Sequence, residues 1–247
     1  MVIETGIIVA GTGYAGSAIA RALSSDARST APYILLDKKH QEMVLDIILS
    51  EAGEVAGALV ARNGKIEPIK APAVVLATGS VAGVFPKGDW THSGDGLAIA
   101  HRAGLALAKP HLQGDELRTG VPCKADGSTA LVGLFVAGSL GADRPDPLKV
   151  ARAAILRSQE GVEAFGPYRM HPDIDSALPP GFAQVKFDRL HGITSKALSG
   201  EVPREHTLIE LHRLKGEADD FARARCDVEL FSLQNACEVA ILLFKGT

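Results

Sequence analysis

The strongest constraint on the fold lies almost at the start of the chain. An apolar, β-rich run, Ile7–Ala10, leads directly into the glycine-rich turn over 11–16 (GTGYAG). A helical pattern follows over 17–23, and a second apolar run over 33–36 ends at Asp37. A strand, a GxGxxG turn, a helix and a second strand that ends in an acid are typical of the βαβ unit that binds dinucleotides.

Each part of this unit has a physical role. Gly11 permits the tight turn, Gly13 lets the backbone approach a pyrophosphate, and Gly16 lets the helix pack close to the strand. The helix N-terminus offers N–H groups and a partial positive charge to phosphates. Asp37 lies about 20 residues beyond the last glycine, where a carboxylate accepts hydrogen bonds from ribose hydroxyls. The turn alone does not separate NAD from FAD, and an ordinary glycine-rich turn remains the simplest alternative.

Composition excludes several classes of protein. The chain has 247 residues, of which 46% are hydrophobic and 22% charged, and its formal net charge of −3 gives no electrostatic reason to expect a nucleic-acid partner. The apolar run Val239–Phe244 is too short to cross a bilayer, and the residues before the first strand do not resemble a signal peptide. Three cysteines without a CxxC pair predict reduced thiols. We therefore expect a cytoplasmic protein with no membrane span.

The middle of the chain predicts an antiparallel excursion followed by a return to the parallel sheet. Two strand-like runs, over 55–61 and 65–69, flank the dipeptide Asn63-Gly64, which is a strong hairpin signal. The next run, over 73–79, is apolar almost throughout, as expected for a strand covered on both faces. The fold class predicted is therefore α/β.

Later segments add helices and one more strand. Helical spacing extends over 95–108, with Ser93 as its expected N-cap, and again over 148–165. The run over 133–138 indicates another buried strand. Helix formers dominate from 205 to 244 and predict a helical C-terminal region.

Several motifs occur in the order known from one family. The strand over 73–79 ends in ATG, and the turn at 93–96 (SGDG) opens a helix that ends in Arg102-Ala103-Gly104. The block over 126–138 and the helical stretch over 228–235 follow. Together these resemble the flavoprotein family of succinate dehydrogenase, fumarate reductase and L-aspartate oxidase, in which ATGG, TGDG…RAGA and GxT…GLYAAGE stand in the same order.

This resemblance implies FAD as the cofactor. The glycines of the first turn would hold its pyrophosphate, Asp37 its adenosine ribose and the backbone near Val44 its adenine. Asp95 would lie near the flavin-facing turn, although a carboxylate there also suits the helix dipole. The full set of expected cofactor contacts is Gly11, Gly13, Tyr14, Ala15, Gly16, Asp37, Lys38, Val44, Ala77, Thr78, Gly79, Asp95, Gly138 and Ser139.

The expected organisation is a Rossmann-like FAD-binding domain over 1–166 with a parallel sheet and a β-hairpin excursion, a linker over 167–204 and a small helical region over 205–247. Two departures from the family stand out. Ser139 occupies a position where the family carries Glu. Between Gly104 and Thr119 the family inserts a capping domain that contributes to substrate binding, whereas this chain has only the short segment 105–118.

The resemblance also implies a reaction, which is hydride transfer between a small (di)carboxylate, such as succinate, fumarate or L-aspartate, and the flavin. The stretch 141–144 (GADR) resembles the family's GANR, whose arginine binds the substrate carboxylate, so Arg144 is the candidate catalytic-site residue; a solvated surface role is its alternative. Histidines such as His92 lack metal-ligand spacing and are left out of the site. The alternative function is a non-catalytic or partner-dependent FAD- or dinucleotide-binding module, with a protein partner or a second copy completing the site.

Overall fold

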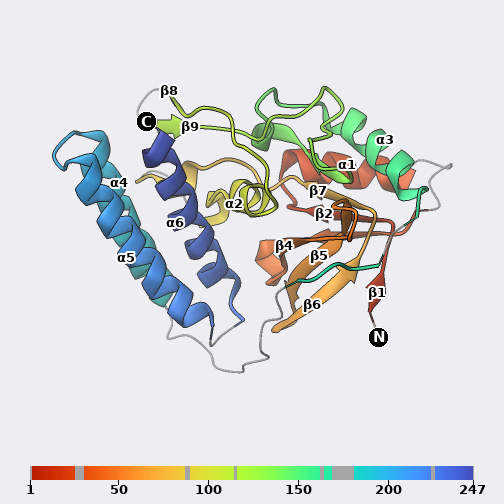
Figure 1. Ribbon diagram of the computed structural model, residues 1–247, viewed down its shortest axis with the longest axis horizontal. Coiled ribbons are helices and arrows are strands. Elements are labelled where there is room, and N and C mark those ends of the chain that lie inside the picture. Colours follow the sequence, from red (N-terminus) through yellow and green to blue (C-terminus); the bar gives the residue numbers. More distant parts are fainter. Residues whose placement is uncertain are drawn as a thin grey trace.

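The computed structural model describes residues 2–25, 31–86, 90–113, 116–161, 164–168, 181–223 and 226–246. Figure 1 shows a parallel sheet beside helices α1 and α3, with a second sheet below it. A group of three long helices lies on the other side of α2 from the two sheets. The predicted α/β class is confirmed.

The parallel sheet has the strand order β10-β7-β2-β3. Its strands are β2 (Ile7–Ala10), β3 (Tyr33–Leu36), β7 (Ala73–Leu76) and β10 (Leu134–Val136). Because successive side chains alternate between faces, Ile7 and Val9 pack in the core beneath α1 (Tyr14–Ser25) and α3 (Pro147–Ser158), while Ile8 packs in the larger core on the other side. Coverage on both faces explains why these strands are apolar.

The antiparallel excursion forms most of the second sheet, whose order is β1-β6-β5-β4 and in which the short N-terminal strand β1 pairs with β6 in parallel. Its strands are β1 (Ile3–Glu4), β4 (Met43–Leu49), β5 (Val55–Arg62) and β6 (Lys65–Lys70). Asn63 and Gly64 both have positive φ, at 52° and 71°, as the two-residue hairpin turn requires. The hairpin predicted from the sequence is confirmed.

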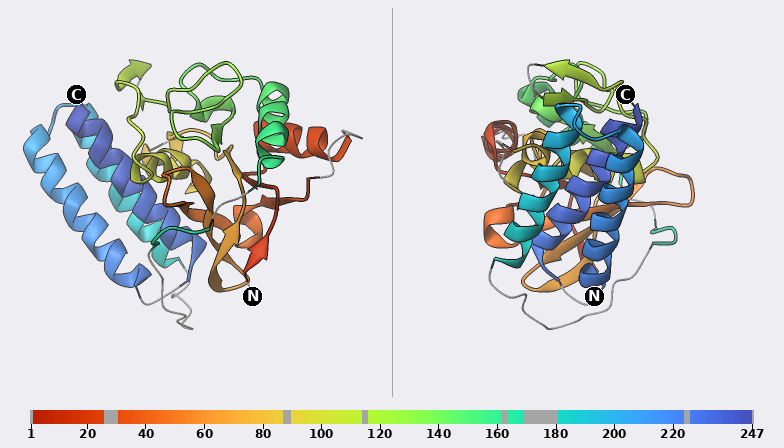
Figure 2. Two further views of the ribbon diagram at one scale, coloured as in Figure 1. Left: turned by 45° about the vertical axis from the view of Figure 1, so that its right-hand side comes forward. Right: turned by 90° about the vertical axis from the view of Figure 1, so that its left-hand side faces the viewer.

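Three long helices lie side by side at the C-terminal end, as both views of Figure 2 show: α4 (Phe182–Leu198), α5 (Arg204–Ala222) and α6 (Val228–Gly246). Helix α4 falls within the expected linker 167–204, so that linker assignment was wrong from residue 182 onward. Four residues at helical spacing are buried on one side of α4 and give it a reason to fold there: Ala183, Phe187, Leu190 and Thr194. The linker's residues 169–180 lie outside the described residues.

Two predicted helices end earlier than expected. Helix α2 covers Asp95–Arg102 and is followed by Gly104 at a φ of +91°, and α3 ends at Ser158, before Gly161 at +79°. Left-handed glycines of this kind terminate helices. The expected cap also differs, because Gly94 occupies the N-cap position of α2 and Ser93 instead accepts a hydrogen bond from Lys38.

Shorter elements complete the chain. Strands β8 (His111–Gln113) and β9 (Glu116–Arg118) pair in a small hairpin after α2. The single-turn 3-10 helices are η1 (Lys38–His40), η2 (Ala82–Val84), η3 (Trp90–His92) and η4 (Gly138–Leu140). In the described part of the chain, no helix combines the length and apolar character that crossing a bilayer requires.

Candidate cofactor site

A cavity of about 800 Å³ lies at the carboxyl ends of the parallel strands. Its walls come from the β2–α1 turn, the segment after β3, the start of β4, the ends of β7 and β10, and the starts of α2 and α3. Ligands of open α/β sheets bind in the crevice at this edge. The volume is also within the range of pockets that enclose small molecules.

The glycines of the first turn differ in what surrounds them. A Cβ on Gly11 would lie 2.5 Å from the carbonyl oxygen of Ala77, and one on Gly16 would lie 1.9 Å from the carbonyl oxygen of Gly11. A Cβ on Gly13 would meet no protein atom within 4 Å, and Gly13 lines the cavity. The turn is therefore packed tightly against β7 on one side and open at Gly13. An extended pyrophosphate fits this cradle, because its oxygens need close approach to the backbone.

Helix α1 begins at Tyr14 at the edge of the cavity. Its first turn carries no acidic side chain, so nothing in that turn neutralises the positive end of the helix dipole. The hydroxyl of Ser17 is turned back onto the carbonyl oxygen of Thr12, at 2.7 Å, and holds the turn. This end of the helix suits an anionic group.

Asp37 follows β3 and lines the same cavity. One of its carboxylate oxygens accepts a hydrogen bond from the backbone N–H of Lys39 at 3.0 Å, which fixes the side chain at the start of η1. The other oxygen lies 3.5 Å from Nδ1 of His40. The carboxylate is thus held in place at the position where the βαβ unit offers an acceptor to a ribose.

A buried ion pair forms another part of the wall. The ammonium of Lys38 lies 2.7 Å from the carboxylate of Asp95, whose side chain is only 2% exposed, and also donates to Oγ of Ser93 at 3.1 Å. Next along α2, the backbone N–H of Gly96 donates to Oγ1 of Thr78 at 2.9 Å. These contacts join the start of α2 to the ends of β3 and β7.

The cavity brings together almost all the residues singled out from the sequence. Gly16 lies under the turn instead of lining the cavity. The predicted residues that line it are Gly11, Gly13, Tyr14, Ala15, Asp37, Lys38, Val44, Ala77, Thr78, Gly79, Asp95, Gly138, Ser139 and Arg144.

Arg144 lines the cavity, as do Gly138 and Ser139. Its backbone has a φ of +49°, which is uncommon for a residue other than glycine, and its N–H donates to the carbonyl oxygen of Gly141 at 3.0 Å. A tight turn therefore sets the direction in which the arginine leaves the backbone. Strained backbone of this kind is frequent at binding sites.

Sequence reasoning missed several lining residues. His92 lies in the cavity wall, with its ring carbon Cδ2 3.2 Å from where a Cβ of Gly79 would stand, although its lack of metal-ligand spacing had excluded it. Its position just before the SGDG turn was the available signal. The other missed lining residues are Ala10, Thr12, Leu36, Lys39, Glu42, Met43, Ser80, Thr91, Ala137, Pro145 and Pro147.

Fold and site together define a dinucleotide-binding α/β protein of the flavoprotein kind. A family model described as an FAD binding domain matches residues 6–134, and the chain belongs to this family. The match decides between NAD and FAD and confirms FAD as the cofactor.

Individual relatives agree with this assignment. The chain is 30% identical over 146 residues to L-aspartate oxidase of Halobacterium salinarum. This alignment covers 51% of this chain and 28% of that protein. Among solved structures, the fold is similar to adenylylsulfate reductase of Archaeoglobus fulgidus, with a TM-score of 0.69 at 11% identity, covering 99% of this chain and 88% of that one. It is also similar to Mycobacterium smegmatis Sdh1 in complex with UQ1, with a TM-score of 0.61 at 12% identity, covering 93% and 63%. The chain thus spans little more than a quarter of the curated relative.

Proposed function

We propose that the protein is an FAD-dependent oxidoreductase that passes a hydride between a small carboxylate or dicarboxylate and the flavin. The observation that carries this proposal is a single cavity whose lining includes the glycine turn, Asp37 and Arg144. The chemistry that FAD supplies when bound is reversible acceptance of a hydride at its N5 atom. Relationship to L-aspartate oxidase supports a substrate of the succinate, fumarate or L-aspartate kind.

Different residues of the cavity bind different parts of the cofactor. The glycine turn and the N-terminus of α1 hold the pyrophosphate, and Asp37 accepts hydrogen bonds from the adenosine ribose. The backbone near Val44 meets the adenine. The strand ends at Thr78-Gly79 and Gly138-Ser139 approach the rest of the cofactor.

Arg144 anchors the substrate. A guanidinium offers a planar pair of N–H donors that matches the two oxygens of a carboxylate, and it remains charged at every relevant pH. Arg144 lines the same cavity as the glycine turn and Asp37, which supports a substrate site next to the cofactor. Holding the substrate at a fixed distance and orientation is a large part of the catalysis that such a site provides.

The test is to add succinate or L-aspartate to the FAD-bound protein without oxygen. Reduction of the bound flavin is monitored as the loss of its visible absorbance. Arg144→Gln should bind FAD as the unaltered protein does but require at least about tenfold more substrate for the same rate, as expected when a charge-assisted contact is lost. Arg152→Gln removes an exposed arginine of α3 that does not line the cavity and serves as the matched control. Reduction by no carboxylate, or equal loss in both variants, would contradict this assignment.

A second candidate is an FAD-binding module that turns over only with a partner. The short segment between α2 and Thr119 favours it, because in the described residues this stretch holds only the β8–β9 hairpin where the resemblance implies a capping domain. A protein partner or a second copy would then complete the site. This candidate predicts bound flavin that no carboxylate bleaches in the isolated chain. For either function we propose a cytoplasmic location, which three cysteines without a CxxC pair favour.

A further inference from the structure

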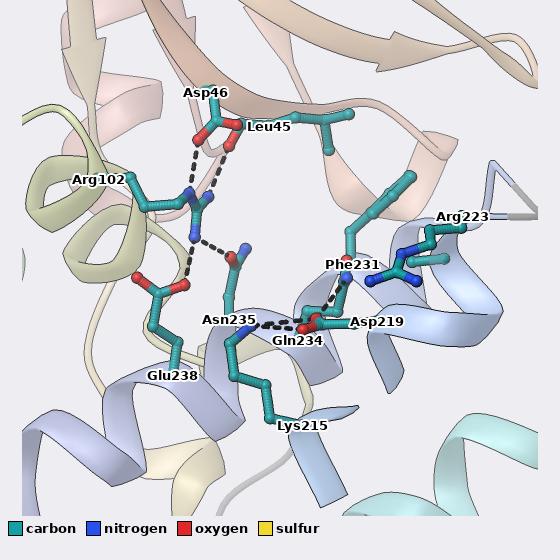
Figure 3. A pocket seen from close by; sticks show the side chains of 11 residues that line it. Leu45, Asp46, Arg102, Lys215, Asp219, Arg223, Phe231, Gln234, Asn235 and Glu238 are labelled. Carbon is teal, nitrogen blue, oxygen red and sulfur yellow. Dashed lines mark hydrogen bonds and ion pairs between the residues drawn. The ribbon is translucent and has the colours of Figure 1, made fainter. Parts of the chain in front are cut away.

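Helix α2 presents two charged side chains to the same neighbour. Asp95 and Arg102 are seven residues apart, which is about two helical turns, so both side chains leave the same face. That face packs against α6. Asp95 lines the cofactor cavity, whereas Arg102 lines a separate, smaller pocket between α2, β4 and the C-terminal helices (Figure 3).

Arg102 is the centre of the contacts in that smaller pocket. Its Nε donates to Asp46 at 2.6 Å and its Nη2 to the carbonyl oxygen of Leu45 at 2.7 Å, both on β4. Its Nη1 donates to Glu238 at 2.8 Å and to Oδ1 of Asn235 at 3.0 Å, both on α6. Burial alone lowers the pKa of Arg102, but the carboxylates of Asp46 and Glu238 outweigh it and raise that pKa above its usual value. The guanidinium therefore ties β4 to α6 (Figure 3).

Asn235 connects this cluster to the cofactor cavity. Its Oδ1 accepts from Arg102, and its Nδ2 donates to Oδ1 of Asp95 at 2.9 Å. The side chain is almost wholly buried. A primary amide is both donor and acceptor, so it satisfies a guanidinium on one side and a carboxylate on the other. An aspartate could satisfy only Arg102, and a leucine neither.

The second oxygen of Asp95 is held from the cavity side. Oδ2 accepts a hydrogen bond from the ammonium of Lys38. The buried carboxylate is therefore held between Lys38, which follows β3, and Asn235 of α6. If Asn235 were replaced by an apolar residue, the buried carboxylate of Asp95 would lose one of its hydrogen-bond donors, which is costly in free energy. Because Asp95 and Lys38 both line the cavity, the loss of this hydrogen bond would disturb the cavity wall.

We propose that Asn235 is a positioning residue for the FAD site, through which the C-terminal helices hold Asp95, and by way of Arg102 also β4, in the geometry that binds the cofactor. Strand β4 contributes Met43 and Val44 to the cavity wall, directly before the Leu45 and Asp46 that Arg102 holds. The C-terminal helical group thus belongs to the cofactor site although Asn235 does not line the cavity. This inference rests on FAD binding in that cavity and not on the substrate proposed above.

The first test compares two changes on the same helix. Asn235→Leu removes both contacts, while Gln234→Leu makes the same change of an amide to an apolar group one residue earlier, where Gln234 donates to Asp219 of α5 and does not line the cofactor cavity. We expect Asn235→Leu to raise the Kd for FAD at least about tenfold, the size of effect that accompanies loss of a hydrogen bond to a charged group. Gln234→Leu should leave the Kd within about twofold.

The second test uses pH and separates positioning from a general loss of folding. Asn235→Asp keeps an acceptor for Arg102 but places a second carboxylate against Asp95, so at about pH 8 the two charges repel and FAD affinity falls. Toward about pH 5 the two carboxyl groups can share a proton, which restores a donor between them. Among the described contacts, the charged groups on the pair are Lys38, which contacts Asp95, and Arg102, which contacts residue 235; Asp46 and Glu238 in turn contact Arg102. Burial and then Asp227 raise the pKa of Glu229, while its interaction with Lys38 lowers it.

We therefore expect the ratio of the Asn235→Asp Kd to the unaltered Kd to shrink as the pH falls. FAD binding is measured as quenching of flavin fluorescence. Thermal unfolding of the apo-proteins is measured in parallel. A ratio that stays constant with pH, an Asn235→Leu protein that binds FAD normally, or equal weakening by Gln234→Leu would overturn the proposal. Failure of the unaltered protein to bind FAD would instead overturn the cofactor site itself, and absence of reduction by carboxylates would affect only the proposed reaction.

Discussion

Gly13 and Gly16 belong to one sequence motif but are required for different physical reasons. Gly16 has no room for a side chain because the carbonyl oxygen of Gly11 occupies the place of its Cβ, so its requirement concerns folding. Gly13 has open space in front of it, so its requirement concerns what the cavity must admit. The sequence motif already distinguishes these two roles, and the surroundings of each glycine fit its role.

Alanine at each position should separate the two effects. We expect Gly16→Ala to destabilise the protein by about 1–3 kcal/mol, since an overpacked turn must shift. Gly13→Ala should leave unfolding almost unchanged while weakening FAD binding, because the new methyl group enters the space that the pyrophosphate needs. Denaturant unfolding of the apo-proteins and FAD titration measure the two quantities. Equal stability of the two variants would contradict the distinction drawn here.

Other residues show why sequence predicts some contacts and misses others. Asp37 and Asp95 were predictable because each follows a recognisable turn at a fixed distance. His92 was missed because its only local signal is its position just before the SGDG turn, and its place in the cavity follows from the way η3 packs over Gly79. Asn235 depends on contacts across 140 residues of chain, which no local pattern encodes.

At the scale of elements, the sheet was predictable and the helical region only in part. Strands with continuous apolar runs and the Asn63-Gly64 turn have strong local signals. Helix α4 was missed because the preceding prolines favoured a linker, while its buried stripe is narrow and its exposed face carries Val185. The stripe becomes informative only once α5 and α6 lie beside it.

An ion-pair cluster joins α4 to α5. Glu217 of α5 accepts from Lys186 at 2.6 Å and from Arg189 at 2.9 Å, both of α4. The hydrogen bond from Lys186, and then that from Arg189, lower the pKa of Glu217 below its ordinary value of 4.5. A lowered pKa in the folded state means that the cluster stabilises the protein above the ordinary pKa and ceases to do so as the pH falls through the folded value.

Glu217→Gln should therefore reduce the free energy of unfolding near neutral pH by up to about 1 kcal/mol, because the cluster is partly exposed to solvent. The difference from the unaltered protein should fade as the pH falls below the ordinary pKa of 4.5 and through the lower pKa of Glu217 in the folded state. High salt should also reduce it through screening. Urea unfolding at several pH values measures this, and a difference that persists unchanged in acid would show that the ion pairs are not its source.

At the scale of the whole molecule, both sheets and the starts of α1, α2 and α3 line one cavity, and α6 packs against α2. The parallel sheet supplies the strand ends, β4 supplies one wall, and α6 reaches the cavity through Asn235 and Asp95. Figure 1 shows α6 beside α2 and β4, between the other C-terminal helices and the sheets. Both sheets thus line the cofactor cavity directly, whereas the C-terminal helices contact its wall through α6.

The most direct test of this account is the identity and amount of nucleotide that the purified protein binds. Heating should release FAD, in a ratio of one per chain after saturation, and titration of the apo-protein should quench flavin fluorescence with a saturable curve. Gly13→Ala should weaken that curve without unfolding the protein. Release of no flavin together with no saturable response to FAD would contradict the cofactor site.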